Sequence, residues 1–436
     1  MSVCISPKPK YSRCKDRADV TERVIIMELT QPLKKEKKKA EKNTTKIDSV
    51  ATASATPMKK VIGLEPFIFL GVFLVFFGWM GSKMGVINMM NTLMNTAFDL
   101  LLNTCFYIMS IAVLAGAIAA LLTEFGIVAV MNKLISPLMK PLYGLPGASI
   151  IGVFATYLSD NPAILTLADD HGFKRYFKKY QLPALCNIGT AFGMGMIITT
   201  FMMGIASPTG ESFVKAALIG NLGAIIGSIV SVRLMLMFTS KHYGTTEYCI
   251  HDDSSNSVDL QNYRTVRPGT AGGRFLSAML EGGKSGVEMG MAIIPGVLII
   301  CTLVMMLTNG ASADGTFTGA AYEGIAFLPM VGEKLNFILR PLFGFASSKG
   351  ISVPITALGA AGAAIGLIPK MVAEGFASAN DIAVFTAMCM CWSGYLSTHV
   401  AMMDSLKCPE MTGKAIISHT IGGLLAGISA HWIYML

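Results

Sequence analysis

The sequence predicts an all-α, polytopic membrane protein whose two halves are inverted copies of one layout. Its 436 residues are 53% hydrophobic and 14% charged, with a mean hydropathy of +0.56. A soluble domain of this size carries about 25% charged residues. Apolar segments of bilayer-spanning length follow one another from about residue 61 to the last residue. We expect about 9 to 11 transmembrane or re-entrant helical segments in two inverted repeats.

The repeat is visible as a short recurring string. Residues 140–144 (KPLYG) reappear as 340–344 (RPLFG), and a Lys-Leu pair precedes each copy at nearly equal distance. After each copy come a Gly/Ala/Ser-rich apolar segment with an interruption, a polar loop and two further apolar spans. Repeated halves with interrupted spans are typical of secondary transporters.

Charge and hydropathy divide the chain into five regions. The tail, residues 1–60, holds 15 of the 35 basic and 7 of the 27 acidic residues, so it accounts for the net charge of +8. Its low apolar content predicts disorder, apart from a short surface helix at 18–30, and basic residues beside a first span predict a cytoplasmic N-terminus. The other regions are a first span with its loop (61–97), a first repeat (98–240), a polar cytoplasmic connector (241–280) and a second repeat (281–436).

Eleven apolar segments are expected, and two of them are amphipathic. The segments before the connector are 61–80, 98–122, 125–143, 147–168, 182–206 and 212–239, and those after it are 286–308, 323–345, 350–369, 381–403 and 414–436. Whether 125–143 and 323–345 cross the bilayer or lie on it stays open. If both lie on the interface, 147–168 and 350–369 must be re-entrant hairpins.

Loop charge predicts the orientation. Residues 174–179 carry four basic side chains, whereas the loop 309–323 carries acidic residues and no basic one. Because Lys and Arg collect in cytoplasmic loops, we expect residues 174–179 on the cytoplasmic side and 309–323 on the outside. The membrane that we expect is the plasma membrane.

The first candidate site is the interruption of segment 147–168 by Ser-Asp-Asn-Pro at 159–162. A carboxylate buried among apolar residues is costly and usually functional, and non-helical backbone at membrane depth needs a polar cavity. The next span carries polar Asn187 and Thr190. Alternatively, 159–162 is a cytoplasmic turn and the polar pair only supports helix packing. The candidate substrate-binding residues here are Ser159, Asp160, Asn161, Asn187 and Thr190.

The second half offers a weaker polar set. Segment 381–403 contributes Ser393, Ser397 and Thr398 as substrate-binding candidates, with helix packing as the alternative. Three residues are candidates for the coupling ion or proton: Asp160, Glu288 and His399. For Glu288 the alternative is a solvated helix face shared with Glu281 and Lys284, and for His399 an interfacial position.

Composition favours transport over catalysis. The sequence has no P-loop, zinc spacing or nucleophile elbow, so we expect no enzyme activity and no metal centre or other cofactor beyond coupling Na⁺ or H⁺. Met388-Cys389-Met390-Cys391 offers soft sulfur atoms, but neighbouring helix positions point about 100° apart, which favours core packing over a copper or iron site. The bilayer and a small solute are the expected partners, homo-oligomerisation is compatible, and nucleic acid is not expected.

These features resemble the Gate or nucleoside-recognition membrane family over about residues 98–436. That family includes spore maturation proteins and the gate of the ferrous iron transporter B. The chain is also distantly similar to concentrative nucleoside transporters. The similarity lies in the Pro-Leu-aromatic-Gly ends and in Asp160, Asn161 and Pro162. It implies that Ser159, Asp160 and Asn161 touch the solute and that Asn187 and Thr190 support the ion or solute. Segment 350–369 departs from the pattern because it has no carboxylate.

Three functions follow as hypotheses. The first is an ion-coupled secondary transporter, a symporter of a small polar solute such as a nucleoside-like molecule, with alternating access between the repeats. The second is a metal-ion permease, and the third is a non-transporting membrane scaffold or assembly protein. A solute carrier should hold polar groups at the breaks of both halves, whereas a permease should bring Cys, Met or carboxylates to one point.

Overall fold

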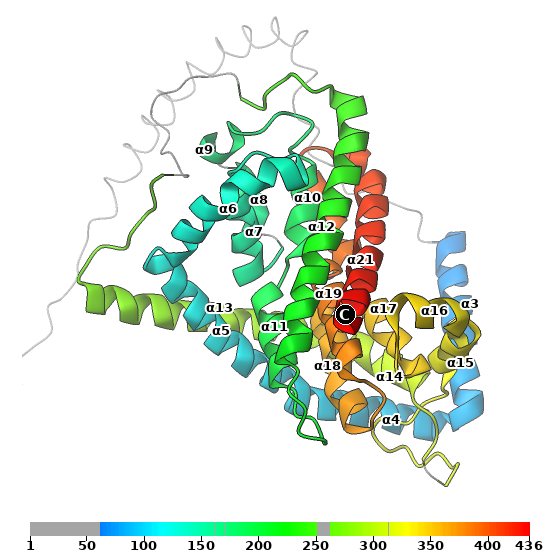
Figure 1. Cartoon of the computed structure of the whole chain (residues 1–436). Helices are drawn as coiled ribbons and strands as arrows, with labels where there is room; N and C mark the ends of the chain where they lie inside the picture. Colours follow the sequence, from blue (N-terminus) through cyan, green and yellow to red (C-terminus); the bar gives the residue numbers. More distant parts are fainter. Residues whose placement is uncertain (1–61, 162, 170, 251–261, 313) are drawn as a thin grey trace, which may run out of the picture. The chain divides into compact units, whose positions relative to one another are not determined.

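The structure, a computed structural model, describes residues 62–161, 163–169, 171–250, 262–312 and 314–436 (Figure 1). Over these residues the chain is helical, with one isolated β-bridge between Lys178 and Tyr248. Six of the described helices are long and apolar enough to cross a membrane. The predicted all-α, polytopic class is therefore confirmed. The expectations for the tail, for Pro162 and for the connector residues 251–261 lie outside the described residues.

Among the described residues, the first half consists of the helix α3 and ten further helical elements. The described residues divide into two units, up to Val72 and Phe73–Leu436, and every contact below lies in the second. The elements are α3 (Leu64–Met84), α4 (Val86–Asp99), the π-helical η1 (Leu100–Cys105), α5 (Phe106–Glu124), α6 (Ile127–Tyr143), α7 (Ser149–Leu158), α8 (Ala163–Asp169), α9 (His171–Lys174), α10 (Ala184–Ala191), α11 (Gly195–Gly204) and α12 (Val214–Tyr243).

The second half follows a similar order after the connector, with short 3-10 turns before α17 and α21. Its elements are α13 (Ala271–Gly296), the π-helical η2 (Val297–Cys301), α14 (Thr302–Thr308), α15 (Phe327–Lys334), α16 (Asn336–Phe343), η3 (Ser348–Ile351), α17 (Ser352–Ala357), α18 (Ala361–Ala373), α19 (Ala379–Cys391), α20 (Tyr395–Ser405), η4 (Pro409–Met411) and α21 (Thr412–Met435).

Corresponding irregularities occur at corresponding places in the two halves. Each half opens with a long helix that contains a π-helical segment, η1 in one and η2 in the other. The recurring strings end α6 and α16 at Gly144 and Gly344, whose φ angles are +74° and +63°. A left-handed residue after the last helical turn closes a helix, and glycine adopts it without strain. The repeated string is thus a repeated helix end.

The two opening helices are longer than the sequence predicted. Residues 86–124 form 39 helical residues and 271–308 form 38, where 98–122 and 286–308 were expected. At 1.5 Å per residue each is about 57 Å long, nearly twice the hydrocarbon core. The predicted region boundaries at 97/98 and 280/281 fall inside these helices. The first turns of these helices are polar or Gly-rich, so the hydropathy of the added residues is low. A search for apolar segments of bilayer-spanning length therefore did not include them.

The interrupted segments fold back on themselves or bend. In 147–168, helix α7 packs on α8, and a Cβ placed on Gly152 would lie 2.9 Å from Ile164 Cδ1. In 350–369, α17 packs on α18 across a break at 358–360. The amphipathic segment 323–345 is two short helices, α15 and α16, and 125–143 is the 17-residue α6. The hairpin arrangement is the one expected if the amphipathic helices lie along the interface.

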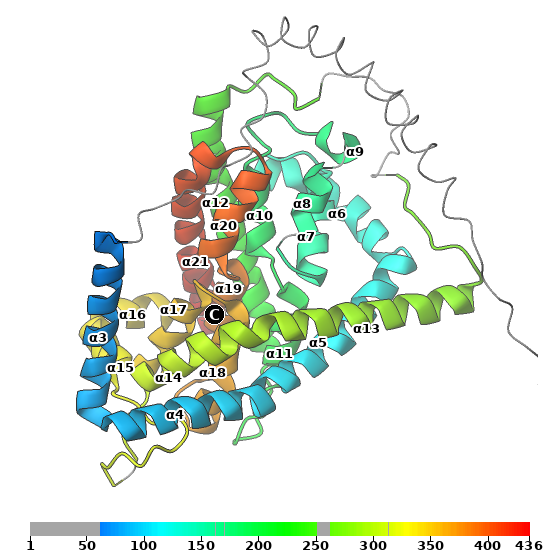
Figure 2. The same ribbon diagram turned by 180° about the vertical axis from the view of Figure 1, so that it is seen from behind.

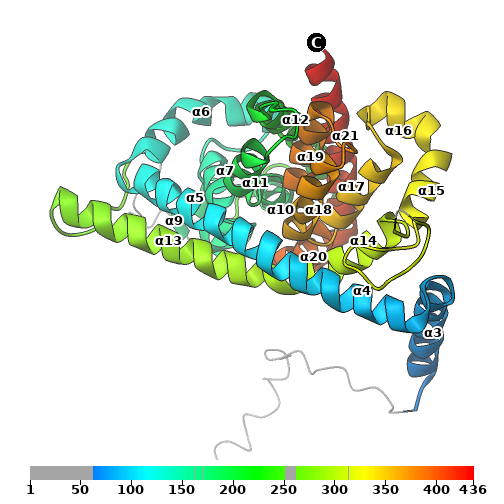
Figure 3. The same ribbon diagram turned by 90° about the horizontal axis from the view of Figure 1, so that it is seen from below.

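Glycines hold the principal helix pairs together. Helices α5 and α13 run side by side (Figures 2 and 3), and a Cβ on Gly116 would lie 2.5 Å from Gly282 O. Helices α12 and α21 also pack along their lengths, and a Cβ on Gly227 would lie 2.3 Å from Gly422 O. Because lipid gives no hydrophobic driving force for helix association, van der Waals contact between closely approaching backbones stabilises these pairs. These pairs form the frame around the interrupted helices.

Candidate functional site

Four helix breaks meet at one place in the second unit, and we call this place the break cluster. The breaks are 159–161 between α7 and α8, 192–194 between α10 and α11, 358–360 between α17 and α18, and 392–394 between α19 and α20. The breaks at 192–194 and 392–394 are as far apart in sequence as the recurring strings at 140–144 and 340–344. A break leaves backbone groups without helical partners, so each one brings polar atoms into an apolar interior.

Asn161 connects three of the breaks. Its Nδ2 donates to Ser393 O at 2.6 Å, and the side chain is 1% exposed. Because a carbonyl only accepts, this bond fixes the amide orientation and turns Oδ1 the other way. A Cβ added to Gly193 would lie 1.5 Å from that Oδ1. The oxygen therefore lies directly against the break between α10 and α11.

The fourth break joins the cluster through main-chain bonds. Gly394 N donates to Ala357 O at 3.2 Å, and Leu396 N donates to Leu358 O at 3.3 Å. Gly394 has a φ of +67°, so glycine suits the turn that exposes its N–H to the hairpin tip. All four breaks are thus connected through Asn161, Ser393 and the turn at Gly394.

Asn161 Oδ1 has no hydrogen-bond partner among the described residues, although the atom is buried. An unsatisfied buried acceptor costs about 1 to 3 kcal/mol. Nearby Asp160 is half-buried, and its Oδ1 accepts from Asn161 N at 2.7 Å. The first break thus carries an unsatisfied acceptor oxygen and, on the preceding residue, a carboxylate.

A second buried polar group surrounds Asn187 one turn before the break. Asn187 Nδ2 donates to Ser231 Oγ at 2.9 Å and to Ala415 O at 3.2 Å. Ser231 Oγ lies 2.9 Å from His419 Nδ1, and His419 Nε2 lies 2.5 Å from Cys391 O. Since the carbonyl only accepts, Nε2 carries the proton and Nδ1 of the neutral ring accepts from Ser231. The bonds run in one direction and fix the tautomer of His419.

Thr190 and His399 lie together beside this group. Thr190 Oγ1 donates to Cys186 O at 2.9 Å and lies 3.5 Å from His399 Nδ1. The rings of His399 and His419 have centroids 4.7 Å apart, and both side chains are fully buried. Within the described part of the chain, Asn187 Oδ1 and His399 Nε2 also lack hydrogen-bond partners. The predicted residues Asn187, Thr190 and His399 are therefore neighbours.

The remaining predicted residues are placed less centrally. Ser159 Oγ donates to Ala155 O at 2.7 Å, and Thr398 Oγ1 donates to Gly394 O at 2.9 Å, so each hydroxyl bonds its own helix. Ser397 lies on α20, but its side chain is outside what the structure describes. Glu288 is exposed on α13, where its Oε1 lies 3.9 Å from Lys284 Nζ, as the alternative of a solvated helix face predicts. Ser393 contributes its main-chain carbonyl to the break cluster, where it accepts from Asn161.

Five further residues belong to this region but were not selected from the sequence. Tyr157 Oη donates to Asn221 Oδ1 at 3.0 Å, and Asn221 Nδ2 donates to Thr199 Oγ1 at 2.9 Å. This group flanks Gly195, whose added Cβ would lie 2.2 Å from Tyr157 Cδ2. Ser231 and His419 are the other two. Their only sequence signal is a polar side chain inside an apolar span.

The described residues contain no group of three or more His, Cys, Asp or Glu side chains able to hold a metal ion. Met388, Cys389, Met390 and Cys391 are all buried in α19, as core packing predicts.

Comparison with known proteins gives a likeness of arrangement. No protein-family model matches the sequence, and no curated protein matches it. Among solved structures it is similar to CNTnw, a concentrative nucleoside transporter, in an inward-facing substrate-bound state, with 14% identity, 85% of each chain covered and a TM-score of 0.49. A variant of CNTnw in an outward-facing state gives 13% identity, 84% and 85% coverage and a TM-score of 0.48. Likeness of this extent assigns neither a substrate nor site residues to this chain.

Proposed function

We propose that this protein is an ion-coupled secondary transporter of a small polar solute. The observation that carries the proposal is the meeting of four helix breaks, two from each half, around the buried and unsatisfied oxygen of Asn161. Interrupted helices from two repeats that meet within the apolar interior are how secondary transporters build their binding sites. In this proposal the solute and its coupling ion bind at the break cluster.

The chemistry of the break cluster limits what can bind there. Asn161 Oδ1, Asn187 Oδ1 and His399 Nε2 are the unsatisfied atoms of this region among the described residues. The two amide oxygens only accept, so they require a donor or a cation. A solute with hydroxyl or N–H groups, such as a nucleoside-like molecule, meets that requirement, and so does Na⁺. Asp160 adds a negative charge next to Asn161, which favours a cationic partner.

Basic side chains support the proposed orientation. Lys178 Nζ donates to Thr245 O at 2.8 Å, so the basic loop lies against the connector. The connector also binds Glu124, at one end of the helix 86–124, whereas Asn88 near its other end donates to Phe317 O at 2.7 Å. Connector residue Arg264 and the loop 309–323 are thus associated with opposite ends of one long helix. We propose a plasma-membrane protein with the connector and N-terminus inside.

Ligand-dependent stability and uptake test the proposal. The full-length protein in nanodiscs should show a higher thermal midpoint with uridine or adenosine in Na⁺ or at acidic pH than in K⁺ at neutral pH, because a ligand stabilises by mass action. Proteoliposomes should accumulate the same probe when given the matching ion gradient. Asn161→Ala should lose both responses, while Glu374→Gln, in an exposed ion pair with Lys370, should keep them.

The result that would overturn transport is specific. A folded protein that shows neither a midpoint shift nor gradient-driven uptake across nucleosides, amino acids and organic acids would favour the scaffold hypothesis. Uptake of Fe²⁺ alone would favour the permease, for which the described residues offer no ligand group.

A further inference from the structure

The last part of the connector is bound to the corner between α5 and α6. We call residues 262–267 the strap. Lys133 Nζ donates to Asn262 Oδ1 at 2.5 Å, Arg264 Nη1 donates to Glu124 O at 2.6 Å, and Arg267 Nη1 donates to Glu124 Oε2 at 2.7 Å. One end of the strap is therefore attached to α6, and the other end is attached to the last residue of α5.

Glu124 is the centre of these attachments. Its side chain is 5% exposed, and its second carboxylate oxygen accepts from Arg274 Nε at 2.7 Å. It is also the last residue of α5, where carbonyls lack helical partners and the helix dipole is negative. One residue thus holds three guanidinium groups, two of them on the strap. Charge-assisted bonds of this kind are about twice as strong as neutral ones.

Gly126 fixes where Arg264 lies. Its φ is +83°, and a Cβ on it would lie 2.7 Å from Arg264 Nε. The left-handed turn between α5 and α6 therefore needs glycine both for its backbone and for the space that the guanidinium fills. The space that Arg264 occupies is therefore formed by the turn between α5 and α6.

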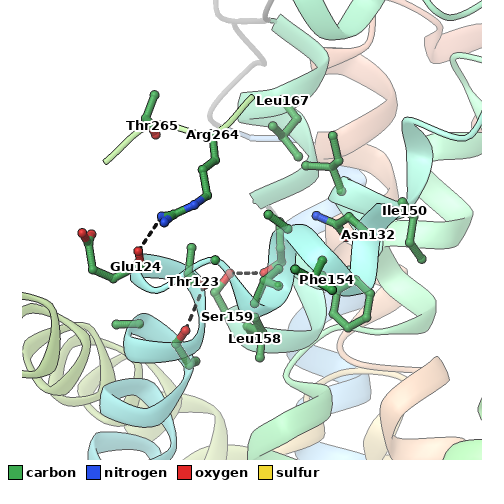
Figure 4. A pocket seen from close by; sticks show the side chains of 18 of the residues that line it. Thr123, Glu124, Asn132, Ile150, Phe154, Leu158, Ser159, Leu167, Arg264 and Thr265 are labelled. Atoms are coloured by element: carbon green, nitrogen blue, oxygen red, sulfur yellow. Dashed lines mark hydrogen bonds between the residues drawn. The ribbon is translucent and has the colours of Figure 1, made fainter. Parts of the chain in front are cut away.

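The strap and Ser159, the first residue of the break 159–161, line the same cavity. The cavity has a volume of about 1470 Å³, and its lining contains all six strap residues, several residues of α7 up to Leu158, and Ser159. Figure 4 shows Arg264 bonded to Glu124 at one edge and Ser159 beside Leu158 within the cavity. Ser159 directly precedes Asp160 and Asn161. Moving the strap would therefore change the aqueous access of Ser159, the residue of the break cluster that lines this cavity.

We propose that the strap is a gate on the aqueous path to the break cluster and that Glu124 is its latch. With the arginines on Glu124, the strap stays against the cavity and limits access to Ser159. With those bonds broken, the strap leaves and the cavity opens to water on the connector side. The role of this motion in transport rests on the proposed function, but the gate can be tested without any solute.

Thiol accessibility at position 159 is the test. The full-length Ser159→Cys protein in nanodiscs is treated with a small hydrophilic maleimide, and modification of that residue is followed by peptide mass spectrometry, which separates it from the native cysteines. Adding Arg264→Gln with Arg267→Gln should raise the modification rate by about tenfold, as expected for loss of hydrogen bonds to a charged group. Arg274 remains on Glu124 in this variant, so its buried charge stays paired.

A second variant acts in the opposite direction and is isosteric. Asn262→Asp keeps the geometry and gives Lys133 a charged acceptor, so it should slow the modification by about threefold, in the range of an exposed ion pair. Lys370→Gln, which breaks an ion pair elsewhere, should leave the rate unchanged. Rates within twofold of the parent in both strap variants would overturn the gate. If the arginine variant fails to fold, the Asn262→Asp rate alone decides.

The gate and the transport proposal fail in different ways. Changed modification rates without uptake of any probe would keep the gate and remove the transporter. Uptake of a probe with unchanged modification rates would keep the transporter and remove the gate.

Discussion

Gly193→Ala should disrupt the break cluster although it removes none of the cluster's polar groups. A Cβ at this position would lie 1.5 Å from Asn161 Oδ1, 2.6 Å from Asn161 Cγ and 3.1 Å from Ser393 Cβ. No rotation of a flexible end relieves such contacts, because Asn161 is short and its Nδ2 is held by Ser393 O at 2.6 Å. Asn161 must therefore leave its place.

The cost follows from two terms. Inserting a methyl group into a packed interior costs about 1 to 3 kcal/mol. Losing the buried bond to Ser393 O adds about 1 to 3 kcal/mol, because the carbonyl is left unsatisfied. We expect a destabilisation of about 2 to 5 kcal/mol after partial relaxation. Gly204→Ala, at the end of α11, the helix that follows this break, is the matched control because its Cβ would lie at an ordinary 3.5 Å from Tyr107 Oη.

Thermal unfolding in nanodiscs and uridine binding are the assays. Gly193→Ala should lower the midpoint and abolish the ligand response, whereas Gly204→Ala should change stability by less than about 1 kcal/mol. Combining Gly193→Ala with Asn161→Gly should recover part of the lost stability, since the clashing amide is gone and contacting residues couple in double-mutant cycles. Equal midpoints for the two single alanine variants, or no recovery in the double variant, would show that the four breaks do not meet around Asn161.

Three further predictions concern charge. Asp160→Ala should abolish uptake while the protein still inserts and folds, and proteoliposome uptake equal to the parent would make Asp160 structural. Cysteines placed at Lys178 and Asp314 should be labelled from opposite sides of intact cells, and labelling from one side would refute the inverted topology. Burial raises the pKa of Glu323, but hydrogen bonds from Ser312 and Thr318 outweigh it and hold the pKa below its ordinary 4.5. The stability that Glu323 gives to its loop is then present above that value and is lost as pH falls through the lower folded pKa. The hydrogen-exchange protection factors of residues 314–326 should therefore fall in acid for the parent protein. In Glu323→Gln these protection factors should lose that pH dependence.

Local signals were enough to predict the repeated architecture. The lengths of apolar segments gave the class, and the string at 140–144 and 340–344 gave the repeat because glycine after a helix end is a local requirement. The start of the first long helix was missed because its polar residues lower the hydropathy there, while their partners are distant in sequence. Asn88, in the first turn of α4, donates to Phe317 O at 2.7 Å, so a polar residue in a transmembrane-length helix is satisfied by a loop more than two hundred residues away.

The candidate site was predicted in its parts but not in its assembly. The first break could be located because a carboxylate, an amide and a proline interrupt an apolar run. The break at 392–394 has no proline, and Ser393 was selected for a hydroxyl whereas the structure uses its carbonyl. Backbone atoms carry no residue-type signal, so the bond from Asn161 across 232 positions to Ser393 could not be read from spacing. The same reason hid His419, whose partners are Ser231 and a main-chain oxygen. A site assembled from helix breaks depends on main-chain N–H and C=O groups that lack partners within a helix. Only the packing of both repeats brings those groups to one point.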